Sequence, residues 1–240
     1  NDLITAPEAA WRATVKLPAS KSISNRALIL NALSSSPYGV ENLSDCDDTN
    51  LMVNALQANG QDFNVGAAGT TMRFLTAFLA KRPGEWTITG TERMKNRPIK
   101  VLVEALNALG AHITYMEKEG FPPLRISGAA LPGGEISLPG HVSSQYISAI
   151  LMVAPLMEKG VTLHLEGEIV SRPYIYITLE LMKQFGVSAT WEDHTIRVLP
   201  QSYTPIRFTV ESDWSAASYW YEMMALSPGA EIELLGLFKE

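Results

Sequence analysis

The sequence predicts an α/β domain in which helices lie inside and β-sheets lie outside. Three observations support this prediction. Two kinds of helix alternate along the chain, short strands fill the gaps between them, and one kind of helix has almost no polar face. A helix without a polar face is usually internal, so the sheets must form the outer layers. We expect three repeated units, each with the order strand, helix, strand, helix, hairpin.

Helices of the first kind begin with small polar residues and then become strongly apolar. Four segments follow this pattern: residues 20–30, 69–77, 143–151 and 213–220. The stretches at 27–30 and 149–154 contain only apolar residues, which predicts burial on all sides. The polar starts of these helices should meet at one end of the domain.

Helices of the second kind carry apolar residues at helical spacing and end with glycine. They are predicted at residues 49–60, 98–110 and 173–186. Pro98 and Pro173 suit the first turn of a helix, and the closing glycines suit a left-handed cap.

Strands with alternating β-branched residues fill the gaps, at residues 85–90, 111–115, 161–165, 188–191 and 195–198. The helix starts recur after about 75 residues between the second and third units, but after only about 50 between the first and second. We therefore expect the first unit to lack its hairpin, because the chain runs almost directly from Gly60 to Gly66.

The net charge of −6 and the pI of about 5.3 argue against nucleic acid and membrane surfaces as partners, because these require broad positive patches. The charge does not exclude small anionic ligands, which a few clustered cations can hold. No apolar run approaches the roughly 20 residues that span a bilayer.

The two termini and the single cysteine indicate the cellular compartment and the extent of the chain. Residues 1–5 lack the features of a signal peptide, and Cys46 cannot form an internal disulfide, so we expect a reducing, cytoplasmic setting. Residues 232–240 resemble a strand that stops without a terminal element. We expect this chain to be part of a longer polypeptide.

The helix starts predict an anion site, because a helix N-terminus presents unpaired N–H groups and the positive end of its dipole. A single start of this kind is usually a plain N-cap. Here Lys21 and Arg26 accompany the first start, Arg73 the second and Gln145 the third. Three such starts together favour a ligand with negative charge.

A second cationic cluster precedes the helix predicted at 98–110. Its four positive residues are Arg93, Lys95, Arg97 and Lys100. The alternatives are a solvated turn and a clamp for a phosphate or carboxylate, which guanidinium groups bind with two hydrogen bonds. The next unit has Ser171 and Tyr174 at the equivalent place, which indicates a ligand that carries both anionic and hydroxyl groups.

Other chemistry finds little support. The four histidines show no metal-ligand spacing, so we expect neither a metal nor a cofactor. Residues 66–71 lack the ending of a phosphate-binding loop. Asp45, Asp47 and Asp48 could form paired carboxylates, but we expect Asp47 or Asp48 to cap the following helix. Cys46 is expected to be structural.

At these residues the sequence resembles the 5-enolpyruvylshikimate-3-phosphate synthases. The resemblance lies in residues 17–26, 68–73, 93–99, 143–145 and 171–174. It implies an enolpyruvyl-transferase-like fold of βαβαββ units, six in a two-domain enzyme. It also implies transfer of the enolpyruvyl group from phosphoenolpyruvate to the 5-hydroxyl of shikimate 3-phosphate, inhibition by glyphosate, and a monomer.

The resemblance also implies site residues. Shikimate 3-phosphate would be bound by Lys21, Ser22, Arg26, Ser143, Ser144, Gln145, Ser171 and Tyr174. Phosphoenolpyruvate would be bound by Lys21, Gly69, Arg97 and Gln145. Lys21 and Arg97 would be catalytic, because they would stabilise negative charge on the departing phosphate.

The chain departs from the family in two ways. Ala67 stands where the family usually has asparagine, so a polar contact is missing or supplied elsewhere. The chain also ends before the second-domain aspartate and glutamate that would move protons. We expect residues 20–211 to form the complete N-terminal domain, and residues 1–19 and 212–240 to begin the second domain. Such a fragment should be inactive alone.

Two alternatives remain at this stage. The UDP-N-acetylglucosamine enolpyruvyl transferases share the fold, but they have a Lys-Asn pair where this chain has Lys21 and Ser22, and their reactive cysteine lies in another region than Cys46. The other alternative is a non-catalytic module that binds anions.

Overall fold

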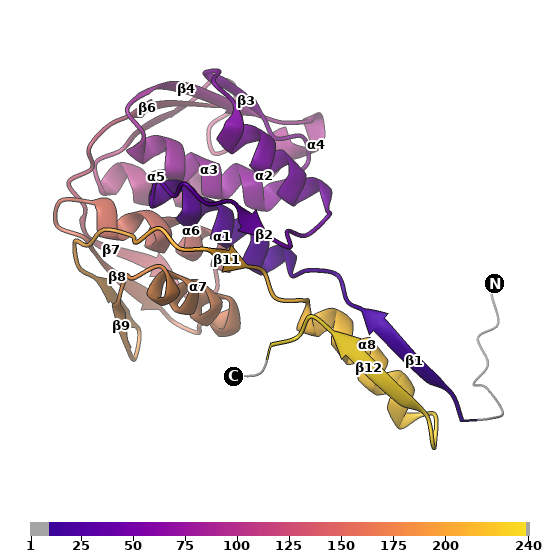
Figure 1. The fold of residues 1–240 in the computed structure, drawn as a ribbon. Helices are drawn as coiled ribbons and strands as arrows, with labels where there is room; N and C mark the ends of the chain where they lie inside the picture. The colour runs from indigo at the N-terminus through magenta and orange to yellow at the C-terminus, as the bar shows by residue number, and fades with distance from the viewer. Residues whose placement is uncertain (1–9, 239–240) are drawn as a thin grey trace.

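Helices lie inside and sheets lie outside in the structure, a computed structural model that describes residues 10–238 (Figure 1). The helices are α1 (Lys21–Leu33), α2 (Asp47–Gln57), α3 (Gly69–Lys81), α4 (Glu92–Lys95), α5 (Lys100–Ala108), α6 (Ser144–Val153), α7 (Arg172–Gln184) and α8 (Trp214–Ala225), with a short 3-10 helix, η1 (Ala154–Leu156), after α6. The predicted α/β class and layer order are confirmed.

Short strands separate the helices. They are β1 (Arg12–Lys16), β2 (Val40–Glu41), β3 (Asp62–Asn64), β4 (Gly84–Thr89), β5 (His112–Tyr115), β6 (Leu124–Gly128), β7 (Gly134–Pro139), β8 (Val161–Glu166), β9 (Ala189–Glu192), β10 (Thr195–Val198), β11 (Phe208–Thr209) and β12 (Glu231–Leu235). The five strands predicted in the gaps between the helices are present, with boundaries that differ by one residue at most. The strand predicted at residues 232–240 is shorter, because β12 ends at Leu235.

Two four-stranded sheets repeat one topology. Their strand orders are β3-β4-β6-β5 and β7-β8-β10-β9, and in each the first pair is parallel and the other two pairs are antiparallel. A third sheet pairs β11 with β2 in parallel, which matches the first two strands of this pattern. Within residues 10–238 no hairpin extends this third sheet, as the short first spacing predicted.

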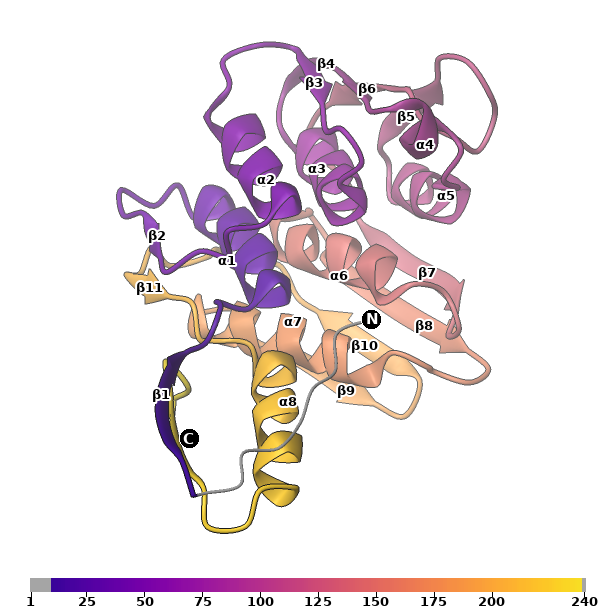
Figure 2. The ribbon, with the colours of Figure 1, turned by 90° about the vertical axis from the view of Figure 1, so that its right-hand side faces the viewer.

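The helices between these sheets form the core. Eleven of the 13 residues of α3 are buried, and nine of the ten residues of α6. Figure 2 shows α1, α3 and α6 side by side, which agrees with the contacts between them. This burial explains why their sequences lack a polar face.

Helix α8 does not follow this pattern. Only Ala217 of this helix is buried, and Tyr219 and Leu226 are largely exposed. The prediction that all helices of the first kind are buried is therefore wrong for α8. In the described part of the chain it packs mainly against β12, which covers one side only.

The predicted helix caps are partly correct. Pro173 lies in the first turn of α7, and Gly110 and Gly186 follow α5 and α7 with φ of 101° and 87°. Pro98 instead precedes α5, which begins at Lys100 after Ile99. Gly60 caps nothing, because α2 ends at Gln57 and leaves the helix in an extended conformation at Ala58.

An extension projects from the domain. Strands β1 and β12 pair in parallel, from Arg12 and Glu231 to Lys16 and Leu235, beside α8 (Figure 1). The segments between β1 and α1 and between β11 and α8 connect this extension to the domain. They are joined by a hydrogen bond of 2.9 Å from Ser20 N to Glu211 O. Parts of the segments predicted to begin a second domain, residues 1–9 and 239–240, lie outside the described residues.

Candidate functional site

The N-terminal ends of α1, α3, α6 and α7 surround a polar pocket of about 310 Å³. The lining residues are Lys21, Ser22, Asn25, Arg26, Thr70, Ser143, Ser144, Gln145 and Tyr174. They carry hydroxyl, amide or cationic groups, and none carries a carboxylate. A pocket of this composition suits a small ligand with negative charge and hydroxyl groups.

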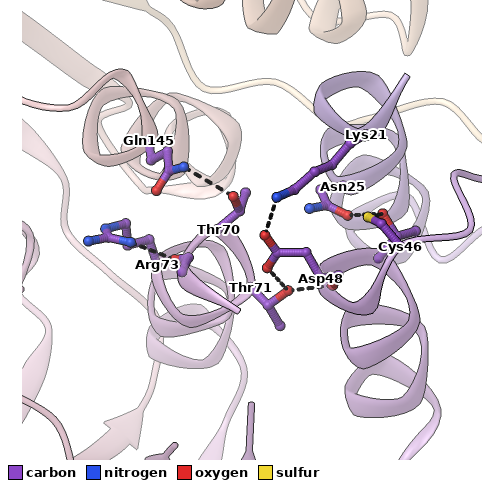
Figure 3. Close-up of polar contacts among 10 residues, drawn as sticks. Lys21, Asn25, Cys46, Asp48, Thr70, Thr71, Arg73 and Gln145 are labelled. Carbon is purple, nitrogen blue, oxygen red and sulfur yellow. Dashed lines mark hydrogen bonds and ion pairs between the residues drawn. The ribbon is translucent and has the colours of Figure 1, made fainter. Parts of the chain in front are cut away.

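Lys21 is the first residue of α1 and forms an ion pair with Asp48. The distance from Lys21 Nζ to Asp48 Oδ2 is 2.5 Å, and the other Asp48 oxygen accepts a hydrogen bond of 3.3 Å from Thr71 (Figure 3). The Asp48 side chain is mostly buried, whereas that of Lys21 is half exposed. Binding of an anion by Lys21 therefore competes with Asp48.

The prediction that Asp47 or Asp48 caps the helix is wrong. The N-cap of α2 is Cys46, whose side chain makes no cap hydrogen bond, and both aspartates lie within the first turn. They still suit the helix dipole there. The position of Asp48 allows its carboxylate to face Lys21, because α1 and α2 are packed together.

Arg26 is buried, at 2% exposure, and it is held on three sides. Its guanidinium donates to Thr178 Oγ1 at 2.7 Å, to Ser22 O at 2.9 Å and to Ser148 Oγ at 3.0 Å. Burial lowers the pKa of Arg26 to about 10. All three partners are neutral oxygens, so the positive charge is available to an anionic ligand at the pocket.

Of the cationic cluster predicted at residues 93–100, Lys95 and Lys100 form ion pairs with Glu117 and Glu119, whereas Arg97 lies with Arg73 at the start of α3. Arg73 donates to Gly69 O at 2.9 Å, and the guanidinium of Arg97 lies so close to Gly69 that an added Cβ would overlap it. Burial, and then the charges of Arg73 and Arg93, lower the pKa of Arg97. Among the described residues no ion pair joins these arginines to a carboxylate. The cluster thus concentrates positive charge.

Gln145 connects the starts of α6 and α3. Its Nε2 donates to Thr70 Oγ1 at 3.1 Å (Figure 3). Ser143 caps α6 by accepting from Gln145 N at 3.3 Å. Ser144 is buried beside them in the pocket wall. Three of the predicted residues thus come from a single helix start.

The remaining predicted residues lie further apart. Tyr174 lines the pocket, whereas Ser171 is the N-cap of α7 and does not. Arg97 lies at Gly69, outside the lining of this pocket. Ala67 lies in a neighbouring hollow of about 570 Å³, which Lys21, Cys46 and Asp48 also line.

Two residues that line the pocket were not singled out from the sequence, and Asp48 was singled out only for a different role. Asn25 and Thr70 lie inside segments already recognised, 17–26 and 68–73, so their positions offered a signal. Asp48 offered none, because its partner Lys21 lies 27 positions away and a carboxylate in a first helical turn is ordinary.

Metal-binding clusters and membrane-spanning helices are both absent from the described part of the chain. No group of three or more histidine, cysteine or acidic side chains there could hold a metal ion. None of the helices described is both long and apolar enough to cross a membrane.

Comparison with known proteins identifies the family. A family model described as EPSP synthase (3-phosphoshikimate 1-carboxyvinyltransferase) matches residues 5–63 and 59–240, which is nearly the whole chain. The chain belongs to the EPSP synthase family. The two matched segments meet at residues 59–63, where the sequence predicted a missing hairpin.

Curated relatives carry the same name. The chain is 61% identical over 238 residues to a 3-phosphoshikimate 1-carboxyvinyltransferase of Bacteroides fragilis, covering 99% of the chain and 58% of that protein. It is 45% identical over 254 residues to a 3-phosphoshikimate 1-carboxyvinyltransferase of Vibrio atlanticus, covering 94% of the chain and 59% of that protein. The chain thus spans less than two thirds of the length of these relatives.

The alignments with these two relatives differ in length. The Vibrio alignment covers 94% of the 240 residues, about 226, so roughly 28 of its 254 positions have no counterpart in this chain. The Bacteroides alignment needs only 238 positions for 99% of the chain. An EPSP synthase structure from Acinetobacter baumannii is similar in fold, with a TM-score of 0.86 at 21% identity, covering 98% of this chain and 58% of that one.

Proposed function

We propose that this chain is the part of an EPSP synthase that binds shikimate 3-phosphate and supplies part of the binding site for phosphoenolpyruvate. The observation that carries the proposal is the pocket where the starts of α1, α3, α6 and α7 gather Lys21, Arg26 and Gln145 with serine hydroxyl groups. The family membership names the reaction, and the pocket supplies the chemistry that one of its substrates requires.

Shikimate 3-phosphate would occupy the 310 Å³ pocket. Arg26 and Lys21 would face its phosphate, and Ser22, Ser143, Ser144 and Gln145 would hydrogen-bond its phosphate and ring substituents. Tyr174 would flank the ring, and Ser171 would lie at the edge. The exposed fraction of Tyr174, 47%, leaves room for that contact.

Phosphoenolpyruvate would lie beside it, at the start of α3. Arg97 and Lys21 would neutralise its phosphate and carboxylate, with Gly69 and Gln145 in contact. The closeness of Arg97 to Gly69, and the charges of Arg73 and Arg93 beside it, support an anion at this place.

The reaction would have two steps. The 5-hydroxyl group loses its proton as its oxygen forms a bond to C2 of phosphoenolpyruvate, a proton adds to C3 as the double bond between C2 and C3 is lost, and a tetrahedral intermediate results. The bond from C2 to the phosphate oxygen then breaks, a proton leaves C3, and inorganic phosphate departs. Lys21 and Arg97 would stabilise the charge on the leaving phosphate, and fixed positions for both substrates would supply much of the remaining rate.

We further propose that residues 20–211 form one complete domain and that 1–19 and 212–240 begin a second. The contact between Ser20 and Glu211, where both connections leave the domain, supports this division. The proton-transfer groups of the family would lie in the part of the second domain that this chain lacks. The chain alone should bind substrate but release no phosphate above the uncatalysed rate when given both substrates.

Other properties implied by the family are also proposals. Glyphosate should compete with phosphoenolpyruvate in the complete enzyme, and the protein should be a cytoplasmic monomer. Size-exclusion chromatography with light scattering tests the monomer, since a mass near 26.3 kDa is expected for this chain.

Calorimetric titration with shikimate 3-phosphate tests the central proposal. Binding to the chain should weaken at least about tenfold in Arg26→Ala and Ser144→Ala, since each loses a hydrogen bond to a charged group. Arg125→Ala and Ser137→Ala serve as matched controls, because both residues are exposed on outer strands. No binding, or binding indifferent to Arg26 and Ser144, would contradict the proposal. Tighter binding of UDP-N-acetylglucosamine than of shikimate 3-phosphate would also contradict the proposal.

A further inference from the structure

The amide of Asn25 is an unpaired donor beside the site. Asn25 is fully buried, and its Nδ2 has no hydrogen-bond partner among the described residues. A buried N–H without an acceptor is costly, and most such groups in proteins are paired. The side chain therefore needs an explanation that its own packing does not supply.

The orientation of this amide follows from its neighbours. Thr49 Oγ1 donates to Asn25 Oδ1 at 2.8 Å, and the thiol of Cys46 lies 3.3 Å from the same hydroxyl group. Because the single proton of the Thr49 hydroxyl group goes to Asn25, the thiol of Cys46 is the donor to Thr49. The amide oxygen thus faces α2, and Nδ2 faces the other way, toward the ion pair of Lys21 and Asp48 (Figure 3).

The ion pair is the group that a ligand must disturb. Lys21 Nζ lies 2.5 Å from Asp48 Oδ2, so an anion that draws Lys21 away leaves that oxygen without its donor. The Asp48 side chain is mostly buried, at 11% exposure, so water can replace Lys21 only in part. Thr71 donates mainly to the backbone oxygen of Asp48 at 2.7 Å and lies 3.3 Å from the other carboxylate oxygen, so it does not replace the donor that Lys21 supplies.

We propose that Asn25 is a positioning residue that donates from Nδ2 to Asp48 when an anionic ligand takes Lys21. Without ligand, Lys21 is paired with Asp48 and the Nδ2 of Asn25 has no acceptor. With ligand bound, Lys21 contacts the ligand and Asn25 donates to Asp48, so each of these three side chains has a partner. Asn25 thereby lowers the cost of releasing Lys21, and this role rests on the proposed function only for the identity of the anion.

Substitution of Lys21 tests the proposal without any ligand. In Lys21→Met, Asn25 should donate to Asp48, which moves the side-chain amide resonances of Asn25 in ¹⁵N–¹H NMR spectra. Lys21→Arg keeps the ion pair, so the same resonances should stay near their wild-type positions. Adding Asp48→Leu to Lys21→Met removes the acceptor and should abolish the shift. Unchanged Asn25 resonances in Lys21→Met would overturn the proposal, whatever the protein binds.

A double-mutant cycle of Asn25 and Asp48 tests whether Asn25 affects ligand affinity through Asp48. Asn25→Ala should weaken shikimate 3-phosphate binding about tenfold, the effect of one hydrogen bond to a charged group. In an Asp48→Asn background Lys21 has no ion pair to leave, so the loss from Asn25→Ala should fall below twofold. Equal losses in both backgrounds would show a direct ligand contact or a merely structural role, and would overturn it. Loss of binding in Arg26→Ala reports separately on the proposed function.

Discussion

Arg26 on α1 and Thr178 on α7 form a buried hydrogen bond of 2.7 Å between side chains 152 positions apart in the sequence. The same Thr178 hydroxyl lies 2.8 Å from Ser148 Oγ on α6 and donates to Tyr174 O at 2.9 Å. One hydroxyl group therefore joins three helices beneath the pocket and holds the guanidinium of Arg26 in place.

The first prediction concerns this hydroxyl. Thr178→Val keeps the volume but leaves the Arg26 Nε buried without an acceptor, so the free energy of unfolding should fall by about 1–3 kcal/mol. Urea denaturation followed by circular dichroism measures this. Thr114→Val on the exposed face of β5 is the matched control and should stay within about 0.5 kcal/mol of wild type. Equal stability of the two variants would contradict the prediction.

The second prediction concerns Gly69, the first residue of α3. Alanine there would place a Cβ against the guanidinium groups of Arg97 and Arg73, which are the ends of flexible side chains and can move. The stability of Gly69→Ala should stay within about 1 kcal/mol of wild type, because alanine is a good helix former.

Binding should respond differently from stability in Gly69→Ala. With shikimate 3-phosphate saturating, phosphoenolpyruvate affinity should fall at least about tenfold, because Arg97 is displaced from its anion. The loss in the double variant with Arg97→Ala should be no greater than in Arg97→Ala alone. Calorimetry that finds additive losses would show that Gly69 does not act through Arg97.

The third prediction concerns Gly128 at the end of β6. A Cβ there would overlap the backbone oxygens of Arg82 and Leu79, at the end of α3. Backbone cannot yield as a side chain can, so Gly128→Ala should lower the free energy of unfolding by about 3 kcal/mol or more. Gly39→Ala is the control, since nothing lies within 4 Å of its added Cβ. A Gly128→Ala variant as stable as Gly39→Ala would disprove this packing.

The fourth prediction concerns the reactivity of Cys46. Burial raises the pKa of its thiol, but hydrogen bonds that Thr49 and Ser44 can donate to the thiolate once it forms, together with the charge of Lys21, lower it by more. The net pKa is below its ordinary value, so the thiolate should form at lower pH than in the unfolded chain.

Alkylation by iodoacetamide measures this thiolate. The midpoint of its pH–rate profile should lie below that of the same chain in urea, and Lys21→Met and Thr49→Val should each move it upward. A folded-state midpoint at or above that of the urea-unfolded chain would contradict the prediction. Residue Cys46 would then be the structural residue that the sequence suggested.

The sequence by itself determined the features that depend on neighbours along the chain. The apolar stretches at 27–30 and 149–154 could only belong to buried helices, because no face of them can meet water. The unequal spacing of the helix starts located the absent hairpin, and the third sheet indeed stops at β2 and β11. The motifs around Lys21, Gly69 and Ser144 were found because glycine and serine at the start of a helix indicate an anion site from the local sequence alone.

Only the tertiary structure decided which side chains face each other. The pairing of Lys21 with Asp48, the three neutral partners of Arg26 and the unpaired amide of Asn25 arise from helices packed together across the domain. Helix α8 shows the same limit, since its sequence resembles that of the buried helices but its surroundings leave it exposed. Hydrophobic periodicity is a property of a segment, whereas burial and hydrogen bonding are properties of its neighbours in space.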